Sequence, residues 1–262
     1  MPSRYIATIK LTAREKLSGG LLALYANYIL RLFYLIPLLY LWRGLFASGV
    51  ARASDEALEM TLPQILSYTY VSALLSEQLG VRTPMSSWLS SDAFINACRR
   101  PTHILADFAA QTVGGWLQTL LLFSLPMALL APLFGVSMLP ASAWVLPSLL
   151  LCVSLGFAID YLFACFILRL KNATWLAYSI RMAVTSLFSG SLIPFALLPW
   201  GIGDWLRLSP FGSLAGAPLA IFAGMEPPLP LLAAQLFWNL AIWPLTLVCF
   251  NKSRERMVSY GG

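Results

Sequence analysis

Charged residues are scarce in this sequence: they make up 11% of its 262 residues, whereas 59% are hydrophobic. A typical soluble domain carries about 25% charged residues. Such an apolar composition indicates an integral membrane protein. The formal net charge of +6 requires no nucleic-acid partner, because basic residues at the cytoplasmic edge of a membrane give the same balance.

Several reactive residue types are also nearly absent. His103 is the only histidine, which excludes the paired-histidine zinc sites of metallohydrolases. No lysine follows a glycine, so the sequence contains no P-loop for ATP. The cysteines are scattered and predict neither a disulfide framework nor a metal site. We therefore expect a non-enzymatic chain without a cofactor or metal of its own.

Apolar runs of about 20 residues, the length that crosses the hydrocarbon core of a bilayer, recur along the chain. They predict an all-α integral membrane fold with six transmembrane helices in one domain, residues 1–262. The segment before the first span is polar and basic, so no cleavable signal peptide is expected. The predicted spans are residues 30–46, 62–79, 106–130, 144–168, 175–198 and 229–250.

The basic residues predict the orientation of these spans. With both termini in the cytoplasm, the inner segments hold twelve of the 17 basic residues, and the outer loops hold only Arg52 and Arg207. Arg31 and Arg43 near the ends of the first span are expected to extend to opposite membrane interfaces. This asymmetry follows the positive-inside rule and predicts two cytoplasmic termini.

Residues 1–22 form a predicted amphipathic interface helix on the cytoplasmic side. Ile6, Ile9, Ala13 and Leu17 recur at helical spacing and form an apolar stripe, while basic residues between them suit anionic lipid headgroups. A disordered basic tail is the alternative interpretation.

The fifth predicted span contains a break. Gly190 loosens the helix, and Pro194 and Pro199 each remove a backbone hydrogen-bond donor. Broken backbone at membrane depth is tolerated only where protein or a water-filled cavity satisfies it, so this segment points to a pathway or gate. A serine-protease turn at Ser189 and Ser191 is disfavoured, because the single histidine is predicted at the opposite side of the membrane.

The longest predicted cytoplasmic loop spans residues 80–105 and contains a short capped helix with a small apolar face. Docking of a soluble partner and resting on lipid are both open interpretations of this helix from its residues alone. The residues concerned are Asp92, Phe94, Ile95, Arg99, Arg100 and Pro101.

Two opposite charges lie within predicted spans, Asp160 in the fourth and Arg181 in the fifth. Charges inside a membrane are expensive and are often paired or functional. A structural ion pair between these two side chains is one hypothesis. A proton relay through Asp160 is the other.

Three stretches carry a resemblance to a known family. They are Trp42-Arg43 with residues 60–70, the loop from Asp92 to Pro101, and Phe188-Ser189-Gly190-Ser191-Leu192-Ile193-Pro194 with the prolines behind it. Together they resemble the permease subunit of ATP-binding-cassette exporters of the type-2 (type V) class, in the bacterial antibiotic and viologen exporter branch. Two family residues differ, since Asp92 and Phe94 stand where the family has glycine and leucine.

The resemblance implies an ATP-driven exporter of the bacterial inner membrane, with ATP and Mg on a separate ATPase subunit. The loop around Asp92 to Arg100 would couple to that ATPase, residues 199–228 would form outer re-entrant helices, and a second permease, identical or homologous, would complete the path through the bilayer. Tyr68, Tyr70 and Phe188 could form a wall for an apolar or amphipathic substrate, although simple packing between spans is the alternative for each aromatic. A secondary transporter using Asp160 and a non-transporting assembly subunit are the competing functions.

Overall fold

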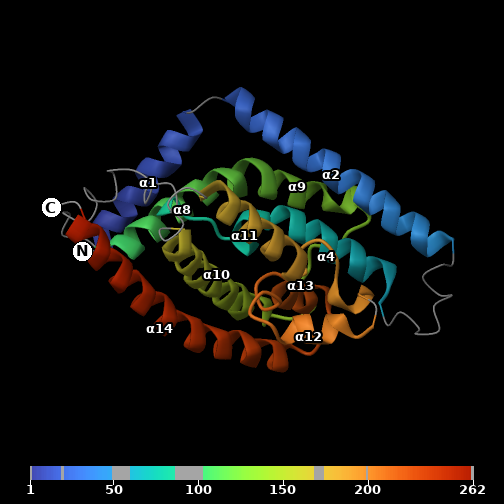
Figure 1. Cartoon of the computed structure of the whole chain (residues 1–262). Coiled ribbons are helices and arrows are strands. Elements are labelled where there is room, and N and C mark those ends of the chain that lie inside the picture. Colours follow the sequence, from blue (N-terminus) through green and yellow to red (C-terminus); the bar gives the residue numbers. More distant parts are fainter. Residues whose placement is uncertain are drawn as a thin grey trace.

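The computed structural model describes residues 2–18, 21–48, 60–85, 103–167, 174–198 and 200–260. Over these residues all regular structure is helical. Most helices run roughly along one long axis, and the N- and C-termini lie at the same end of the molecule (Figure 1). This end is called the terminal end below, and the opposite end is called the far end.

The helices fall into two groups along the chain. The first group comprises α1 (Pro2–Ser18), α2 (Leu21–Ala47), α4 (Leu62–Leu74), α5 (Ser76–Leu79), α8 (Ile104–Thr119), the π-helical turn η1 (Leu120–Ser124), α9 (Leu125–Leu130) and η2 (Ala131–Phe134). The second group comprises α10 (Val145–Ile167), α11 (Thr174–Phe188), η3 (Phe195–Leu197), α12 (Ile202–Leu208), α13 (Gly216–Ala223) and α14 (Pro228–Tyr260).

Within the described residues, four helical stretches are long and apolar enough to cross a membrane. They correspond to the first, third, fourth and sixth predicted spans and cover Tyr25–Ala47, Ile104–Phe134, Val145–Phe166 and Pro228–Ser253. The second and fifth predicted spans instead hold the shorter helices α4, of 13 residues, and α11, of 15 residues. Helix α4 is interrupted at Leu75, and α11 ends just before Gly190, so six full spans stay a prediction.

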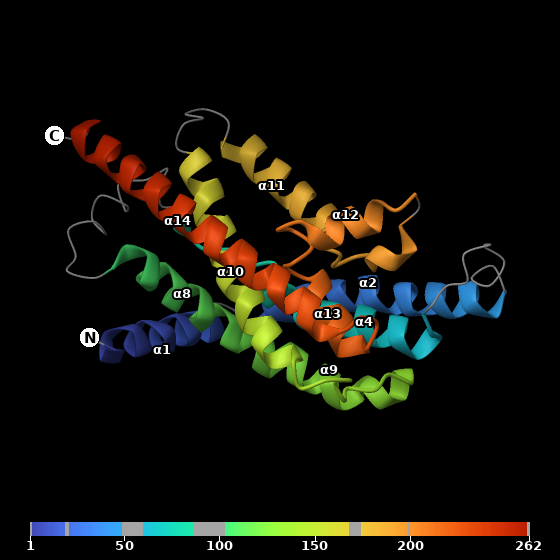
Figure 2. The same cartoon turned by 90° about the horizontal axis from the view of Figure 1, so that it is seen from below.

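Helix α1 packs along α8 beside the terminal end (Figure 2). Gly114 permits the contact, because a Cβ atom at this position would lie 2.7 Å from the backbone oxygen of Ile9. Ile9 and Ala13 of the predicted stripe are half-buried, whereas Ile6 is exposed. The predicted amphipathic helix is therefore present over Pro2–Ser18, with part of its stripe against protein.

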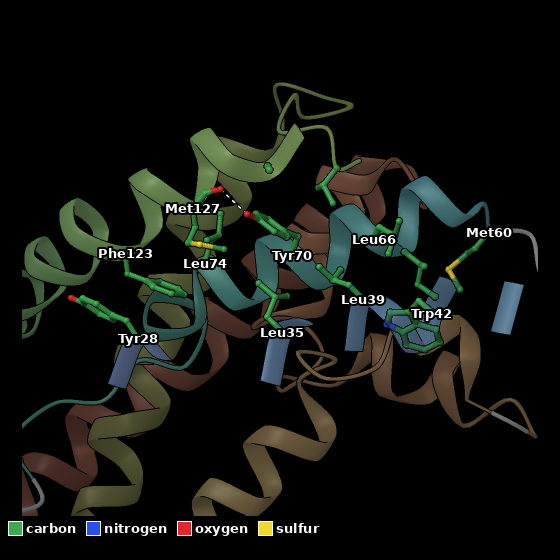
Figure 3. Packing of buried hydrophobic residues seen from close by; sticks show 13 residues of the cluster. Tyr28, Leu35, Leu39, Trp42, Met60, Leu66, Tyr70, Leu74, Phe123 and Met127 are labelled. Atoms are coloured by element: carbon green, nitrogen blue, oxygen red, sulfur yellow. Dashed lines mark hydrogen bonds between the residues drawn. The ribbon is translucent and has the colours of Figure 1, made fainter. Parts of the chain in front are cut away.

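The side of α4 that faces α2 and α9 is packed with large apolar side chains (Figure 3). Tyr28 of α2 stacks on Phe123 at 5.2 Å between ring centroids. Tyr70 of α4 is fully buried, and its hydroxyl donates to the Met127 carbonyl at 2.6 Å. Ser124 caps the end of α4 by donating to the Leu74 carbonyl at 2.7 Å. These contacts fix α4 between its neighbours.

Helices α10 and α14 form the other long packed pair. Polar side chains of α14 recur every three or four residues and bond to α10, an arrangement that holds helices together inside lipid. The bonds join Gln235 to Ser148, Asn239 to the Leu151 carbonyl, Trp243 to Ser154 and Thr246 to the Ala158 carbonyl. This pair supports α13, which is buried along its whole length.

Candidate functional site

The break predicted in the fifth span is present. Helix α11 ends at Phe188, and Gly190 adopts a positive φ of 75°, a conformation that glycine accepts without steric penalty. The chain then bends through Ser191, and Pro194 precedes the short turn η3. The three residues Ser189, Gly190 and Ser191 are called the break segment below.

All three carbonyl groups of the break segment accept hydrogen bonds from other elements. The amide of Gly216 in α13 donates to the Ser189 oxygen at 2.7 Å. The hydroxyl of Tyr68 in α4 donates to the Gly190 oxygen at 2.5 Å, and that of Ser72, one turn further along α4, donates to the Ser191 oxygen at 2.6 Å. The non-helical backbone is thus satisfied by protein, which is the condition for such backbone at membrane depth.

The Phe195 ring fills the space behind the break segment. This side chain is buried and lies against both Gly190 and Gly216. A Cβ atom at Gly190 would lie 2.8 Å from the ring and 3.1 Å from the Tyr68 hydroxyl, so no larger residue fits without movement. Tyr68, Ser72, the break segment and Phe195 together form a compact structure that we call the closure.

A cavity of about 310 Å³ lies on the terminal side of the closure, between α2, α4 and α11. Serine and threonine hydroxyls, three arginines and several leucines line it. Ser72, Ser189 and Ser191 of the closure face this space, which we call the inner cavity.

A second cavity of about 280 Å³, the far cavity, lies between α4, η3, α13 and the start of α14. Tyr68 and Phe195 of the closure line it, together with Arg207 and Glu226. These two charged residues form an ion pair at 3.1 Å. Burial raises the pKa of the Glu226 carboxyl, although the positive charge of Arg207 opposes the shift.

The inner and far cavities have no lining residue in common among those described. Ser72 faces the inner cavity and Tyr68 faces the far cavity, and both bond to the same three-residue segment. The closure therefore forms a wall between two cavities. Helix α4 begins with Leu62 at the far end. Because an α-helix rises about 1.5 Å per residue, Tyr68 lies about 9 Å along the α4 axis from this first residue.

A third cavity, of about 710 Å³, lies at the terminal end between α1, α2, α5 and α8 and is lined largely by polar side chains. We call it the vestibule. It shares Arg31, Gly80 and Arg82 with the inner cavity. Vestibule, inner cavity, closure and far cavity thus follow one another along α4 and α5.

Five of the seven predicted pathway residues come together at the closure or its cavities: Tyr68, Ser189, Gly190, Ser191 and Pro194. The role expected for Tyr70 stays a prediction: its ring packs between α4 and α9 and lines none of the described cavities. Phe188 is 39% exposed at the end of α11 and is likewise absent from the described cavity walls.

Sequence reasoning missed Ser72 and Phe195 as members of the closure, and Gly216 as the donor to its Ser189 carbonyl. Ser72 follows Tyr68 by four residues, the spacing that places two side chains on one helix face, and this signal could have identified it. Phe195 and Gly216 carry no comparable signal, because the contact of Phe195 with Gly190 and the hydrogen bond of Gly216 to Ser189 depend on how the chain folds back after α11.

The predicted coupling residues lie outside the described residues. They are Asp92, Phe94, Ile95, Arg99, Arg100 and Pro101. The described chain reaches this loop at Met85 and leaves it at His103, which stands directly before α8.

The hypothesised pair of Asp160 and Arg181 is confirmed as a buried ion pair between α10 and α11. Asp160 also accepts hydrogen bonds from the backbone amide and the hydroxyl of Thr83, and Arg181 donates to the Val81 carbonyl at 2.6 Å. The pair therefore ties α10 and α11 to the extended segment that leads into the predicted coupling loop. Asp160 lines none of the described cavities.

Among the described residues, no group of histidine, cysteine, aspartate and glutamate side chains could hold a metal ion. Arg31 does not simply extend to a membrane interface, because it pairs with Glu77 at 2.5 Å.

Neither a protein-family model nor a curated protein matches this chain. The arrangement of cavities around the closure therefore carries the functional argument.

Proposed function

We propose that this chain is the membrane-embedded subunit of an ATP-driven exporter, acting as a permease in the bacterial inner membrane with both termini in the cytoplasm. A second permease, identical or homologous, completes the path, and a separate ATPase supplies ATP hydrolysis. The substrate enters from the vestibule side, occupies the inner cavity and leaves through the far cavity when the closure opens.

The observation that carries the proposal is the closure between two cavities. The bonds to the break segment come from two side chains of α4 and one amide of α13, so a small displacement of α11 against both α4 and α13 would break them together. Packed helices with two discrete arrangements are the usual basis of such switching. The absence of a P-loop in the sequence and the family resemblance support an external source of energy.

A proton- or ion-coupled secondary transporter has less support. Its proposed site, Asp160, is bonded by Arg181 and Thr83 and does not itself line any of the described cavities. A carboxyl group that carries protons along a pathway needs contact with water or substrate. If the chain were a non-transporting assembly subunit, the two cavities and their shared wall would have no role.

Purification of the tagged full chain from its native membranes tests the proposal. We expect an ATPase subunit and ATP hydrolysis to co-purify, and we expect Phe94→Glu or Arg100→Glu to release the ATPase while the chain still inserts. Proteoliposomes containing this chain alone that move a fluorescent amphiphile down a proton gradient, without ATP, would refute the exporter and support the secondary transporter.

A further inference from the structure

Polar side chains from two helices line the inner cavity next to the closure. Thr69 of α4 lies three residues before Ser72 of the closure, and both line the cavity. Arg181 and Thr185 of α11 line it as well, and they lie four residues apart, the spacing that places two side chains on one helix face. Polar groups of α4 and α11 therefore meet at one space.

Each of three lining residues has a buried polar atom without a hydrogen-bond partner among the described residues. The atoms are Thr69 Oγ1, Thr185 Oγ1 and Arg181 Nε. The Thr69 side chain belongs to a residue that is 5% exposed, and Arg181 is 6% exposed. Buried polar groups in folded proteins are usually paired, and an unpaired one costs stability. Three such atoms in the wall of one cavity point to a ligand that pairs with them.

The chemistry of these atoms indicates what the ligand must offer. The Nε–H group of an arginine only donates, whereas a threonine hydroxyl both donates and accepts. An acceptor oxygen on the ligand therefore suits all three atoms. A carbonyl oxygen is such an acceptor, it carries no charge, and its two lone pairs accept two hydrogen bonds at once.

The charges of the cavity wall are already compensated within the chain. Arg181 is paired with Asp160, and Arg31 is paired with Glu77 at 2.5 Å. Arg82 is exposed and is not without a partner either. A charged head group that enters the cavity would lose its hydration without gaining a free counter-charge, which is costly. The cavity therefore favours an uncharged ligand over an anion or a cation.

The remaining wall of the inner cavity is apolar and opens to the outside of the chain. Leu35 and Leu38 of α2 and Met182 of α11 contribute to this wall. Tyr34 is 81% exposed and Leu192 is 54% exposed, so both stand at the opening. The volume of about 310 Å³ is at the lower end of the roughly 300–1,000 Å³ typical of small-molecule pockets. It accommodates a polar group and part of one alkyl chain, which extends through the opening toward lipid.

Combining these observations, and resting on the proposed function, we infer that the inner cavity binds an uncharged amphiphile with one alkyl chain and a carbonyl group, an ester or an amide. The carbonyl oxygen accepts hydrogen bonds from Thr69, Thr185 and the Nε–H group of Arg181. The substrate class of the proposed exporter is thereby an uncharged carbonyl compound.

A binding measurement tests this inference without ATP or transport. The purified full chain, in nanodiscs of ether-linked phosphatidylcholine, is titrated with four pyrene-labelled probes of one chain length: a methyl ester, a carboxylate, a trimethylammonium compound and a plain hydrocarbon. Affinities are corrected for partition into empty nanodiscs. We expect the ester to bind about three- to tenfold more tightly than the hydrocarbon, the equivalent of one net hydrogen bond, and more tightly than both charged probes. A charged probe or the hydrocarbon binding as tightly as the ester would overturn the inference.

Threonine-to-valine variants locate the effect in the cavity. Thr69→Val and Thr185→Val should weaken ester binding about three- to tenfold and leave hydrocarbon binding unchanged. Neither should lower the stability of the protein in denaturant, because the hydroxyl that is removed has no partner in the chain. Thr185 is only half-buried, so its variant keeps the test decisive if Thr69→Val fails to fold.

Thr246→Val is the matched control. The Thr246 hydroxyl donates to the Ala158 carbonyl at 2.9 Å, and this residue lines none of the described cavities. We expect its variant to lose stability and to bind the ester normally. Unchanged ester binding in both cavity variants, or the same loss of binding in Thr246→Val, would overturn the inference. A joint loss of stability and binding in both cavity variants would assign their hydroxyls to packing and overturn it as well.

The acyl ester of a bilayer lipid offers the same carbonyl chemistry as a free amphiphile. Repeating the titration in ester-linked phosphatidylcholine distinguishes the two sources: weaker probe binding there identifies the lipid ester as the occupant, and equal binding identifies a free molecule. The inference and the proposed function can also fail separately. A chain that binds the ester selectively but never co-purifies with an ATPase supports the ligand and refutes the exporter. A chain that hydrolyses ATP with its partner but binds all probes equally supports the exporter and refutes the ligand.

Discussion

Tyr68 and Tyr70 lie two residues apart on α4 and point to different sides of it. Each is buried, and each hydroxyl donates one short hydrogen bond to a backbone carbonyl, Tyr68 to Gly190 and Tyr70 to Met127. Two residues correspond to about 200° around a helix axis, so only one of them can face the closure. The pair therefore offers a natural comparison between a residue of the proposed gate and a residue that packs between helices.

We predict that Tyr68→Phe and Tyr70→Phe destabilise the protein by similar amounts, about 1–3 kcal/mol, because each leaves one buried carbonyl unpaired. Only Tyr68→Phe should loosen the closure. The measurement is labelling of Ser186→Cys, in the inner cavity, by an impermeant thiol reagent applied from the far side, in a background with the native cysteines replaced. Equal labelling rates in the two variants would contradict the role given to Tyr68.

Glu226, in the wall of the far cavity, should make the stability of the protein depend on pH. Burial raises the pKa of its carboxyl above the ordinary value of 4.5, so the folded chain keeps this proton to a higher pH than the unfolded chain. At pH values between 4.5 and the raised pKa of the folded chain, unfolding releases a proton. In this range the free energy of unfolding therefore falls as the pH rises. We predict that Glu226→Gln removes this contribution, as measured by denaturant unfolding in detergent across that window. A wild-type profile parallel to that of the variant would show that the shift is absent.

At the scale of elements, the contact between α1 and α8 depends on one glycine of an adjacent pair. Gly114 lies against the Ile9 backbone, whereas a Cβ atom at Gly115 would have nothing within 4 Å. We predict that Gly114→Ala detaches α1, while Gly115→Ala leaves it docked and stabilises α8 by about 0.5–1 kcal/mol through helix propensity. Hydrogen exchange of the α1 amides reports the difference. Unchanged protection in Gly114→Ala would show that α1 does not depend on this close approach.

The ion pair of Asp160 and Arg181 joins α10, α11 and the segment Val81–Thr83. We predict that Asp160→Asn and Arg181→Met each destabilise the protein by about 3–5 kcal/mol, because each leaves an unpaired buried charge. The double variant should be less destabilised than the sum of the two, and a double-mutant cycle measures this coupling. Strict additivity would mean that the two side chains do not depend on each other.

The elements differ in how far the sequence alone reveals them. The break at Gly190 could be predicted, because glycine and proline act on the local backbone wherever they occur. The hydrogen bonds of Tyr68 and Gly216 to the break could not be predicted, since these residues reach it only through long-range packing. The packing of the Tyr70 ring between α4 and α9 could not be predicted either, because the residue pattern of α4 does not reveal which face packs on protein and which lines a cavity. The same ambiguity concealed the inner cavity and its arginines.

At the scale of the whole molecule, the termini lie together at one end (Figure 1). The lining residues place the cavities one after another toward the other end. The Asp160–Arg181 pair links the start of the predicted coupling loop to α11, and α11 leads directly into the break segment. In the proposed exporter, a movement of the loop imposed by the ATPase would therefore reach the closure through one helix. Helix α11 alone would then connect the predicted coupling loop to the closure.

The most direct measurement uses proteoliposomes that hold this chain with its co-purified ATPase. It is the labelling of Ser186→Cys by an impermeant thiol reagent applied from the far side. Ala196→Cys is the control, because it is exposed and lines the far cavity, and we expect it to be labelled in all conditions. The account predicts that Ser186→Cys becomes labelled only while ATP is hydrolysed, as the closure opens. Labelling that is independent of ATP, or that a proton gradient alone produces, would contradict it.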